Sequence, residues 1–269
     1  MLDDDVLVYV SLPLEICELI ISSQDLASAA CCRVCKAWYP RARYHLYTTT
    51  LIRVYKISTF ALCLDLNRAN GALVKYLHIF GIRQLSEKDH ELSLLPILLP
   101  HRLPNLTSLT FEMVSFRALN PSFFTYMRRF YTVISMTWIA VEFGSIYQPV
   151  RLVRSIPHLE QLQILHPSLY RPPSTDVCVG RLRHSISISR LDLSLLGSAL
   201  PDSFIEVFSP TQLAELLVPC GPVDGYITNF KYLKQCSQTL QYLELSFCSG
   251  HRDHFLGTCA SINSQLATH

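Results

Sequence analysis

A six-residue pattern with hydrophobic first, fourth and sixth positions recurs seven times after residue 70, and successive copies begin 25 to 32 residues apart. The copies are Val74-Leu77-Ile79, Leu106-Leu109-Phe111, Val133-Met136-Trp138, Leu159-Leu162-Ile164, Ile188-Leu191-Leu193, Leu213-Leu216-Val218 and Leu240-Leu243-Leu245. The alternation at the end of each copy predicts a short strand, and the spacing leaves room for a helical return. Because no single unit can bury its own apolar row, we expect the strands to stack side by side.

This pattern resembles the longer kind of leucine-rich repeat, in which each unit is a strand followed by a helix. The resemblance implies an α/β solenoid over residues 51–269, with about seven repeats, a parallel curved sheet and helices on the convex side. Pro104 and Pro157 each stand two residues before a leading leucine, where proline can end a helix and set up an extended strand. The stretch 257–265 has little amphipathic pattern, so we expect a weak closing cap there.

Residues 12–47 predict three short helices. The first opens at Leu12-Pro13, because proline at the start of a helix loses no hydrogen bond. Asp25 can cap the second helix, whose apolar residues repeat every four positions until Pro40 ends the run. The third helix is expected over residues 42–47. Helices this short bury little surface alone, so we expect their apolar faces to be shared with a partner or with the following domain.

In order, these residues read LP-x-E-I-x-x-x-I, D-L-x-x-A, C-x-V-C-K-x-W and L-Y, and the series resembles an F-box over residues 8–50. The resemblance implies binding to a Skp-type adaptor of a cullin–RING (SCF) ubiquitin ligase, while the rest of the chain selects a protein substrate. The implied adaptor-binding residues are Leu12, Pro13, Glu15, Ile16, Ile20, Leu26, Val34, Cys35, Trp38 and Leu46.

The outward positions of the expected strands are the candidate target-binding residues, because strand side chains alternate between the core and the opposite face. They are Tyr76, His78, Ser108, Thr110, Gln161, Gln163, Arg190, Asp192, Glu215, Tyr242 and Glu244. Ser135 and Thr137 hold the same positions in the third strand. This mixed polar row suits a protein partner better than a cofactor pocket. An inert solvated sheet is the alternative.

Composition argues against several other classes of protein. A formal charge of +2 with 16% charged residues does not favour a nucleic-acid surface or a disordered tail. The opening residues 1–5 lack the basic region of a secretory signal, and no run of eighteen apolar residues occurs. We therefore expect no membrane partner and a cytoplasmic or nuclear location.

Ten cysteines are scattered along the chain, which favours reduced thiols over a disulfide framework. Cys32 and Cys35 have metal-ligand spacing, but no second pair follows at a useful distance. A zinc module is a separate possibility within residues 248–259, because tetrahedral zinc takes four nitrogen or sulfur ligands. Its ligands would be Cys248, His251, His254 and Cys259. Our prediction remains that the chain holds neither a metal nor a cofactor.

The sequence contains no G-x-S-x-G, Walker, G-x-G-x-x-G or H-E-x-x-H motif. We therefore predict that the chain is not an enzyme, and the F-box resemblance implies a non-catalytic substrate-recognition subunit of a ubiquitin ligase. An interaction scaffold whose F-box no longer binds the adaptor is the alternative function.

Overall fold

The computed structural model describes residue 36 and residues 39–81, 90–145, 147–169, 188–195, 213–220, 239–247 and 260–265. The chain divides into two compact units, Met1–Thr50 and Leu51–His269. In the first unit, α3 (Tyr39–Thr48) is the third helix expected from the sequence. It begins three residues earlier than expected, because Pro40 fits in its first turn, where a missing N–H costs no helical hydrogen bond.

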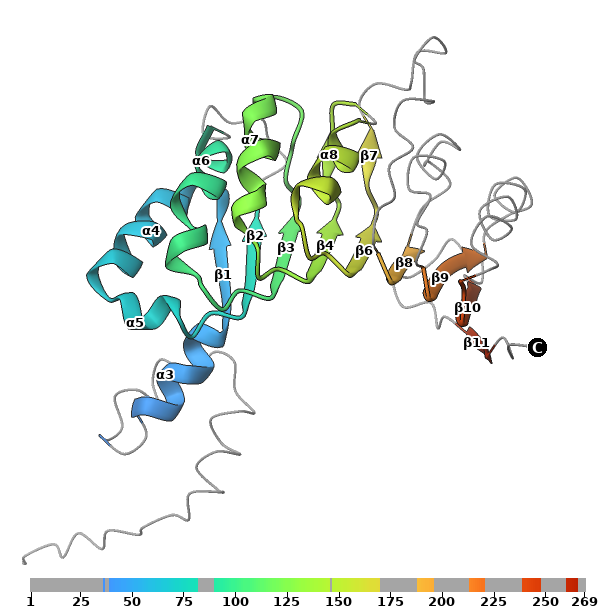
Figure 1. The fold of residues 1–269 in the computed structure, drawn as a ribbon, viewed down its shortest axis with the longest axis horizontal. Coiled ribbons are helices and arrows are strands. Elements are labelled where there is room, and N and C mark those ends of the chain that lie inside the picture. The colour runs from blue at the N-terminus through green and yellow to red at the C-terminus, as the bar shows by residue number, and fades with distance from the viewer. Residues whose placement is uncertain are drawn as a thin grey trace, which may run out of the picture. The chain divides into compact units, whose positions relative to one another are not determined.

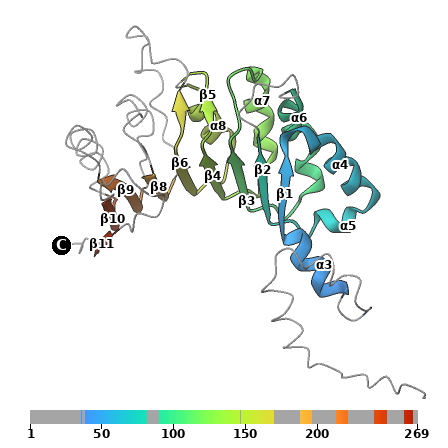
Figure 2. The same cartoon turned by 180° about the vertical axis from the view of Figure 1, so that it is seen from behind.

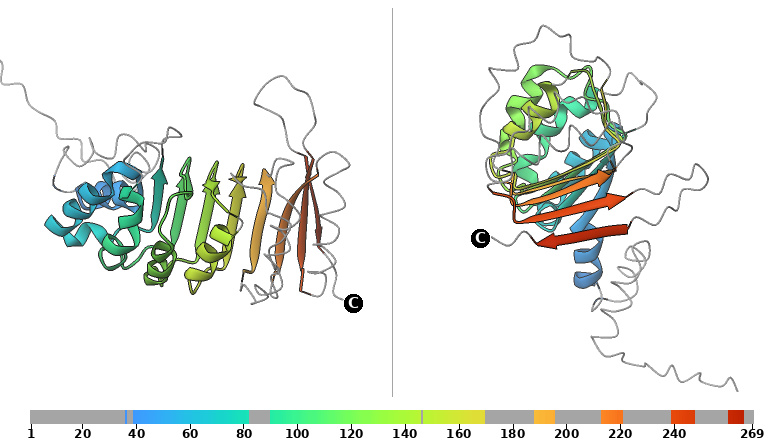
Figure 3. Two further views of the ribbon diagram at one scale, coloured as in Figure 1. Left: turned by 90° about the horizontal axis from the view of Figure 1, so that it is seen from above. Right: turned by 90° about the vertical axis from the view of Figure 1, so that its right-hand side faces the viewer.

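A nine-stranded sheet in the order β1-β2-β3-β4-β6-β8-β9-β10-β11 forms the framework of the second unit. The bounds are β1 (Thr49–Arg53), β2 (Tyr76–Phe80), β3 (Ser108–Glu112), β4 (Ser135–Ile139), β6 (Gln161–Leu165), β8 (Arg190–Leu195), β9 (Glu215–Cys220), β10 (Tyr242–Phe247) and β11 (Ala260–Gln265). Strands β2 to β10 pair in parallel, and their order in space follows their order in the chain (Figure 3). The predicted α/β fold with a parallel sheet is therefore confirmed.

The described helices of the second unit lie on one face of this sheet (Figure 1), and the strands face the viewer from the other side (Figure 2). They are α4 (Ile57–Leu66), α5 (Arg68–Gly71), α6 (His90–Leu98), α7 (Pro121–Tyr126) and α8 (Tyr147–Ser155), with 3₁₀ turns η1 (Val54–Lys56), η3 (Pro100–Arg102) and η4 (Met127–Arg129). Helix α4 packs against α6, α6 against α7, and α7 against α8. None of the helices in the described ranges is long and apolar enough to cross a membrane.

The second and third residues of each of the seven apolar triplets lie in a strand, and the first residue lies two positions before that strand. The middle residues form one row in register across β2, β3, β4, β6, β8, β9 and β10. This row is Leu77, Leu109, Met136, Leu162, Leu191, Leu216 and Leu243, and all of these except the half-buried Leu243 are buried. The strand positions are thus confirmed, and so is the inward direction of the triplet residues whose burial is described, except for the half-buried Leu243.

The third residues of the first five triplets are also buried, namely Ile79, Phe111, Trp138, Ile164 and Leu193. Phe111 and Trp138 are fully buried and contact rings that follow their own strands. The Phe111 and Phe116 ring centroids are 5.2 Å apart, and those of Trp138 and Phe143 are 5.1 Å apart. Phe116 stacks on Phe143 at 5.3 Å, and so joins the two pairs into one aromatic cluster. The second, smaller sheet, β5 (Glu142–Phe143) with β7 (Ser168–Leu169), brings Phe143 to this cluster.

A repeated turn follows three consecutive strands. Met113, Ala140 and His166 come directly after β3, β4 and β6, and each has a positive φ of 50° to 53°. The amide N–H groups of Met113 and Ala140 donate to the last carbonyl of the next strand, at 2.8 Å in both cases. The sequence did not indicate this turn, because none of the three residues is the glycine that usually marks a left-handed conformation.

The last described strand is also absent from the sequence prediction. Strand β11 pairs antiparallel with β10, with Tyr242 opposite Gln265 at one end and Phe247 opposite Ala260 at the other. The sequence of β11 shows little amphipathic pattern. Its backbone hydrogen bonds cover the outer edge of β10, so β10 is not the edge of the sheet.

Candidate functional site

The candidate site is the side of the sheet opposite the helices, which we call the open face (Figure 2). Two in-register rows of outward residues define it. The first row is Tyr76, Ser108, Ser135, Gln161, Arg190, Glu215 and Tyr242, and the second is His78, Thr110, Thr137, Gln163, Asp192, Leu217 and Glu244. All eleven predicted target-binding residues lie in these rows, because parallel pairing in constant register keeps alternate side chains on one side.

Exposure along the open face is uneven. Tyr76 is 48% exposed, whereas Tyr242, the other aromatic residue of the two rows, is half-buried. Asp192, in the middle of the sheet, is only 9% exposed. The face therefore has an accessible aromatic residue near one end and a largely covered carboxylate at its centre.

A short chain of hydrogen bonds crosses the centre of the second row. The Thr137 hydroxyl donates to Oε1 of Gln163 over 3.4 Å, and Nε2 of Gln163 donates to Oδ2 of Asp192 over 2.8 Å. These contacts arise because β4, β6 and β8 are neighbours in register. A buried carboxylate needs such partners, so Gln163 holds Asp192 in place.

Charged side chains on the face are paired with one another. Nε2 of His78 lies 2.7 Å from Oε2 of Glu112, a contact that is an ion pair when the histidine is protonated. The geometry does not make a hydrogen bond, since this shielded nitrogen has no hydrogen-bond partner among the described residues. Nε of Arg190 lies 3.5 Å from Oε2 of Glu215. Both pairs lower the cost of placing charge on a half-buried sheet.

The far end of the face carries a tyrosine and a carboxylate. The Tyr242 hydroxyl donates to Oε2 of Glu244 over 3.2 Å. Partial burial and this hydrogen bond raise the pKa of Tyr242, and the nearby Glu215 adds to the effect. The phenol therefore remains a neutral hydrogen-bond donor through the physiological range.

The predicted adaptor-binding residues are placed only in part. Leu46 lies on α3 and is exposed there. The other nine, from Leu12 to Trp38, lie outside the described residues. The possible zinc ligands at residues 248–259 and the Cys32–Cys35 pair also lie outside them. In the part of the chain that is described, no group of three His, Cys, Asp or Glu side chains could hold a metal ion.

Sequence analysis missed some residues of the open face. Leu217 completes the second row, and a third row adds Phe80, Glu112, Ile139 and Leu165. The signal for the third row was available, because it continues the same alternation two residues beyond each triplet. The third row is mainly apolar and half-buried, so the face is less polar than predicted.

No protein-family model matches this sequence, and no curated protein matches it at a significant level.

Proposed function

We propose that the chain is the substrate-recognition subunit of an SCF-type ubiquitin ligase. The helices within residues 8–50 would bind a Skp-type adaptor, and the open face would bind a protein target. Target binding by the open face is supported by one observation. Eleven separate polar positions align into two continuous rows across β2 to β10. Adaptor binding is supported by the F-box resemblance of residues 12–47.

Such a subunit performs no chemistry of its own. Its contribution is proximity, because a target held in the same complex as the ubiquitin-conjugating enzyme has a high effective concentration there. The open face fits this role, since it offers amide, hydroxyl and phenol groups rather than a deep cavity. Tyr76 is the best anchor for a partner, because exposed tyrosines with a polar tip are frequent hot spots in protein interfaces.

The test uses the full chain with an affinity tag and quantitative mass spectrometry of what copurifies from cells. One variant carries Leu12→Ala and Pro13→Ala in the predicted adaptor site. A second carries Tyr76→Ala on the open face. Tyr131→Ala is the matched control, because Tyr131 is 58% exposed but lies outside the strands, between η4 and β4.

We expect adaptor and cullin subunits to copurify with the wild-type chain and with both tyrosine variants, but not with the Leu12–Pro13 variant. A target protein should be recovered with the Leu12–Pro13 and Tyr131 variants and be depleted with Tyr76→Ala. Failure of the wild-type chain to bring down an adaptor would refute the ligase role. Target binding without adaptor binding would support the scaffold alternative.

A further inference from the structure

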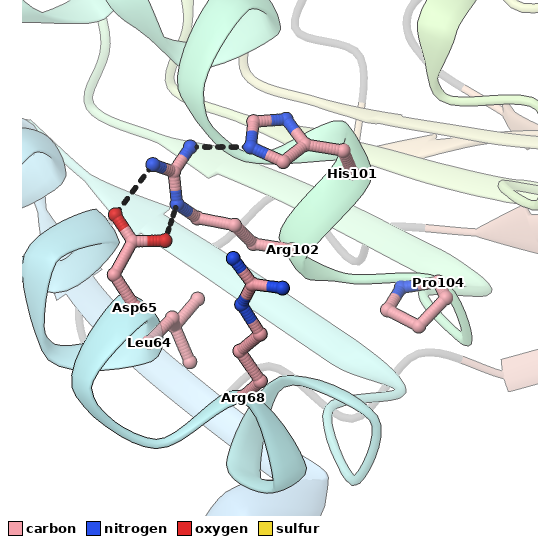
Figure 4. A pocket seen from close by; sticks show the side chains of 6 residues that line it. All are labelled: Leu64, Asp65, Arg68, His101, Arg102 and Pro104. Atoms are coloured by element: carbon pink, nitrogen blue, oxygen red, sulfur yellow. Dashed lines mark hydrogen bonds and ion pairs between the residues drawn. The ribbon is translucent and has the colours of Figure 1, made fainter.

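A hollow of about 530 Å³ lies away from the open face, where α4, α5 and η3 meet (Figure 4). Its lining residues are Leu64, Asp65, Arg68, His101, Arg102 and Pro104. We call it the Arg68 hollow. Two arginines, one histidine and a single carboxylate line it, so its polar groups are mainly hydrogen-bond donors.

The carboxylate is already committed to one of the arginines. Nε of Arg102 donates to Oδ1 of Asp65 over 2.8 Å, and Nη2 donates to Oδ2 over 2.6 Å. This bidentate pair lowers the pKa of Asp65, and the same hydrogen bonds raise the pKa of Arg102. Asp65 is therefore ionised at neutral pH, and both of its oxygens are engaged by one guanidinium.

Further contacts fix the guanidinium of Arg102. Its Nη1 donates to the carbonyl of Leu98 and lies 2.8 Å from Nε2 of His101. Since a guanidinium can only donate, Nε2 of His101 is the acceptor in this contact. Arg102 is thus held from three directions, and one N–H of its Nη2 remains for a ligand.

Arg68 adds a second positive charge to the hollow, which attracts Asp65 without forming a direct pair with it. Its exposed guanidinium forms neither a hydrogen bond nor an ion pair with any residue that the structure describes. Figure 4 shows its side chain pointing toward Arg102 and Asp65. Two guanidinium groups against one carboxylate leave the hollow with a net positive charge of about one.

The backbone around the hollow is closely packed, which keeps Arg68 near Arg102. A Cβ placed on Gly71 would lie 2.0 Å from the carbonyl oxygen of Arg102, so α5 can lie against η3 only because Gly71 has no side chain. Nδ2 of Asn105 also donates to the carbonyl of Ala72 over 2.7 Å and ties the end of α5 to the following turn. The guanidinium of Arg102 and the backbone of Arg68 are therefore positioned before any ligand arrives.

We propose that the Arg68 hollow binds a phosphate group. A guanidinium fork matches the oxygens of a phosphate, and a phosphate dianion compensates the unpaired charge better than a neutral ligand does. The phosphate can belong to a free small molecule or to a phosphorylated side chain. This inference does not depend on the proposed ligase role, because the hollow and the open face share no residues.

The test is isothermal titration calorimetry of the full chain at constant ionic strength, with sodium phosphate and O-phosphoserine as probes and serine as the reference that lacks a phosphate. Arg68→Gln removes the unpaired charge without touching the Asp65–Arg102 pair. Arg128→Gln is the matched control, because Arg128 is also exposed and lies in η4. Circular dichroism checks that each variant is folded.

We expect Arg68→Gln to weaken phosphate binding about tenfold or more, the effect of losing one charge-assisted hydrogen bond. Arg128→Gln should bind like the wild type. Asp65→Asn should bind phosphate more tightly, because it removes the competing negative charge. Tighter binding of O-phosphoserine than of inorganic phosphate would assign the ligand to a phosphorylated side chain, and the reverse order to a small molecule. Absence of phosphate binding by the wild type, or equal binding by the two arginine variants, would overturn the proposal.

Discussion

The division of β3 into a core side and an open side makes a quantitative prediction. Leu109 is fully buried and lies in register between Leu77 and Met136. Leu109→Ala removes the equivalent of about three methylene groups, worth about 2.4 kcal/mol at ~0.8 kcal/mol each. Incomplete closure of the cavity adds about 1 kcal/mol, so we expect a total loss of about 3 to 4 kcal/mol in the free energy of unfolding.

The control is Ser108→Ala, one residue earlier in the same strand and on the opposite face. Its side chain lies on the half-buried open face, so we expect the stability to change by less than about 0.5 kcal/mol. Urea denaturation followed by far-ultraviolet circular dichroism measures both values. A lower m-value for Leu109→Ala would indicate that repeats on the two sides of β3 have uncoupled.

The reverse outcome would refute the reasoning. If Ser108→Ala destabilises the protein by more than Leu109→Ala, then β3 presents the opposite face to the core. A shift of one residue in register has this effect on every side chain of a strand. The open face defined here would then be buried, and the eleven predicted target-binding residues would lose their common surface.

Three further predictions concern backbone and charge. Ala140→Gly should raise the melting temperature by about 2 to 4 °C, since φ = 50° after β4 costs an L-residue about 1 kcal/mol; a lower melting temperature would contradict this. Gly71→Ala should lower the free energy of unfolding, measured by urea denaturation, by about 1 to 3 kcal/mol, because the new Cβ would overlap the carbonyl of Arg102. A gain in stability, as is usual when alanine replaces glycine in a helix, would disprove the close contact. The pKa of Asp65 is held below its ordinary value of 3.8, mainly by its hydrogen bonds from Arg102. The ionised carboxylate therefore stabilises the folded state. This contribution is complete above about pH 4 and is lost as the pH falls through the folded-state pKa. Asp65→Asn should therefore make the acid loss of stability below about pH 4 shallower in denaturation curves, and an unchanged slope would exclude this role.

The positions of the strands could be predicted because their signal is local. Each apolar triplet specifies a strand and its buried side within six residues, and the similar spacing of the triplets lets neighbouring strands align. Trp138 illustrates this point, since its place in the pattern alone identified it as a core residue. The same alternation predicts from the sequence alone that Tyr76 and Gln163 lie on one face of the sheet.

Other features depend on contacts between distant residues and have no local signal. Asp65 and Arg102 are 37 positions apart, and only the packing of α4 beside η3 brings them together. The left-handed turns at Met113 and Ala140 occur in residue types that normally avoid that conformation. Their hydrogen bonds with the next strand stabilise the turn, so the tertiary structure overrides the local preference.

The two candidate surfaces differ in how their charges are satisfied. On the open face, Arg190 is matched by Glu215, and Asp192 is held by Gln163, so the proposed protein target would meet charges that are already paired. In the Arg68 hollow, the matched pair serves to fix Arg102, while Arg68 keeps an unbalanced charge that a bound anion can neutralise. Replacing Arg68 changes no contact on the open face, and replacing Tyr76 changes none in the hollow. Loss of function at one surface therefore says nothing against the other, and each proposal can fail on its own evidence.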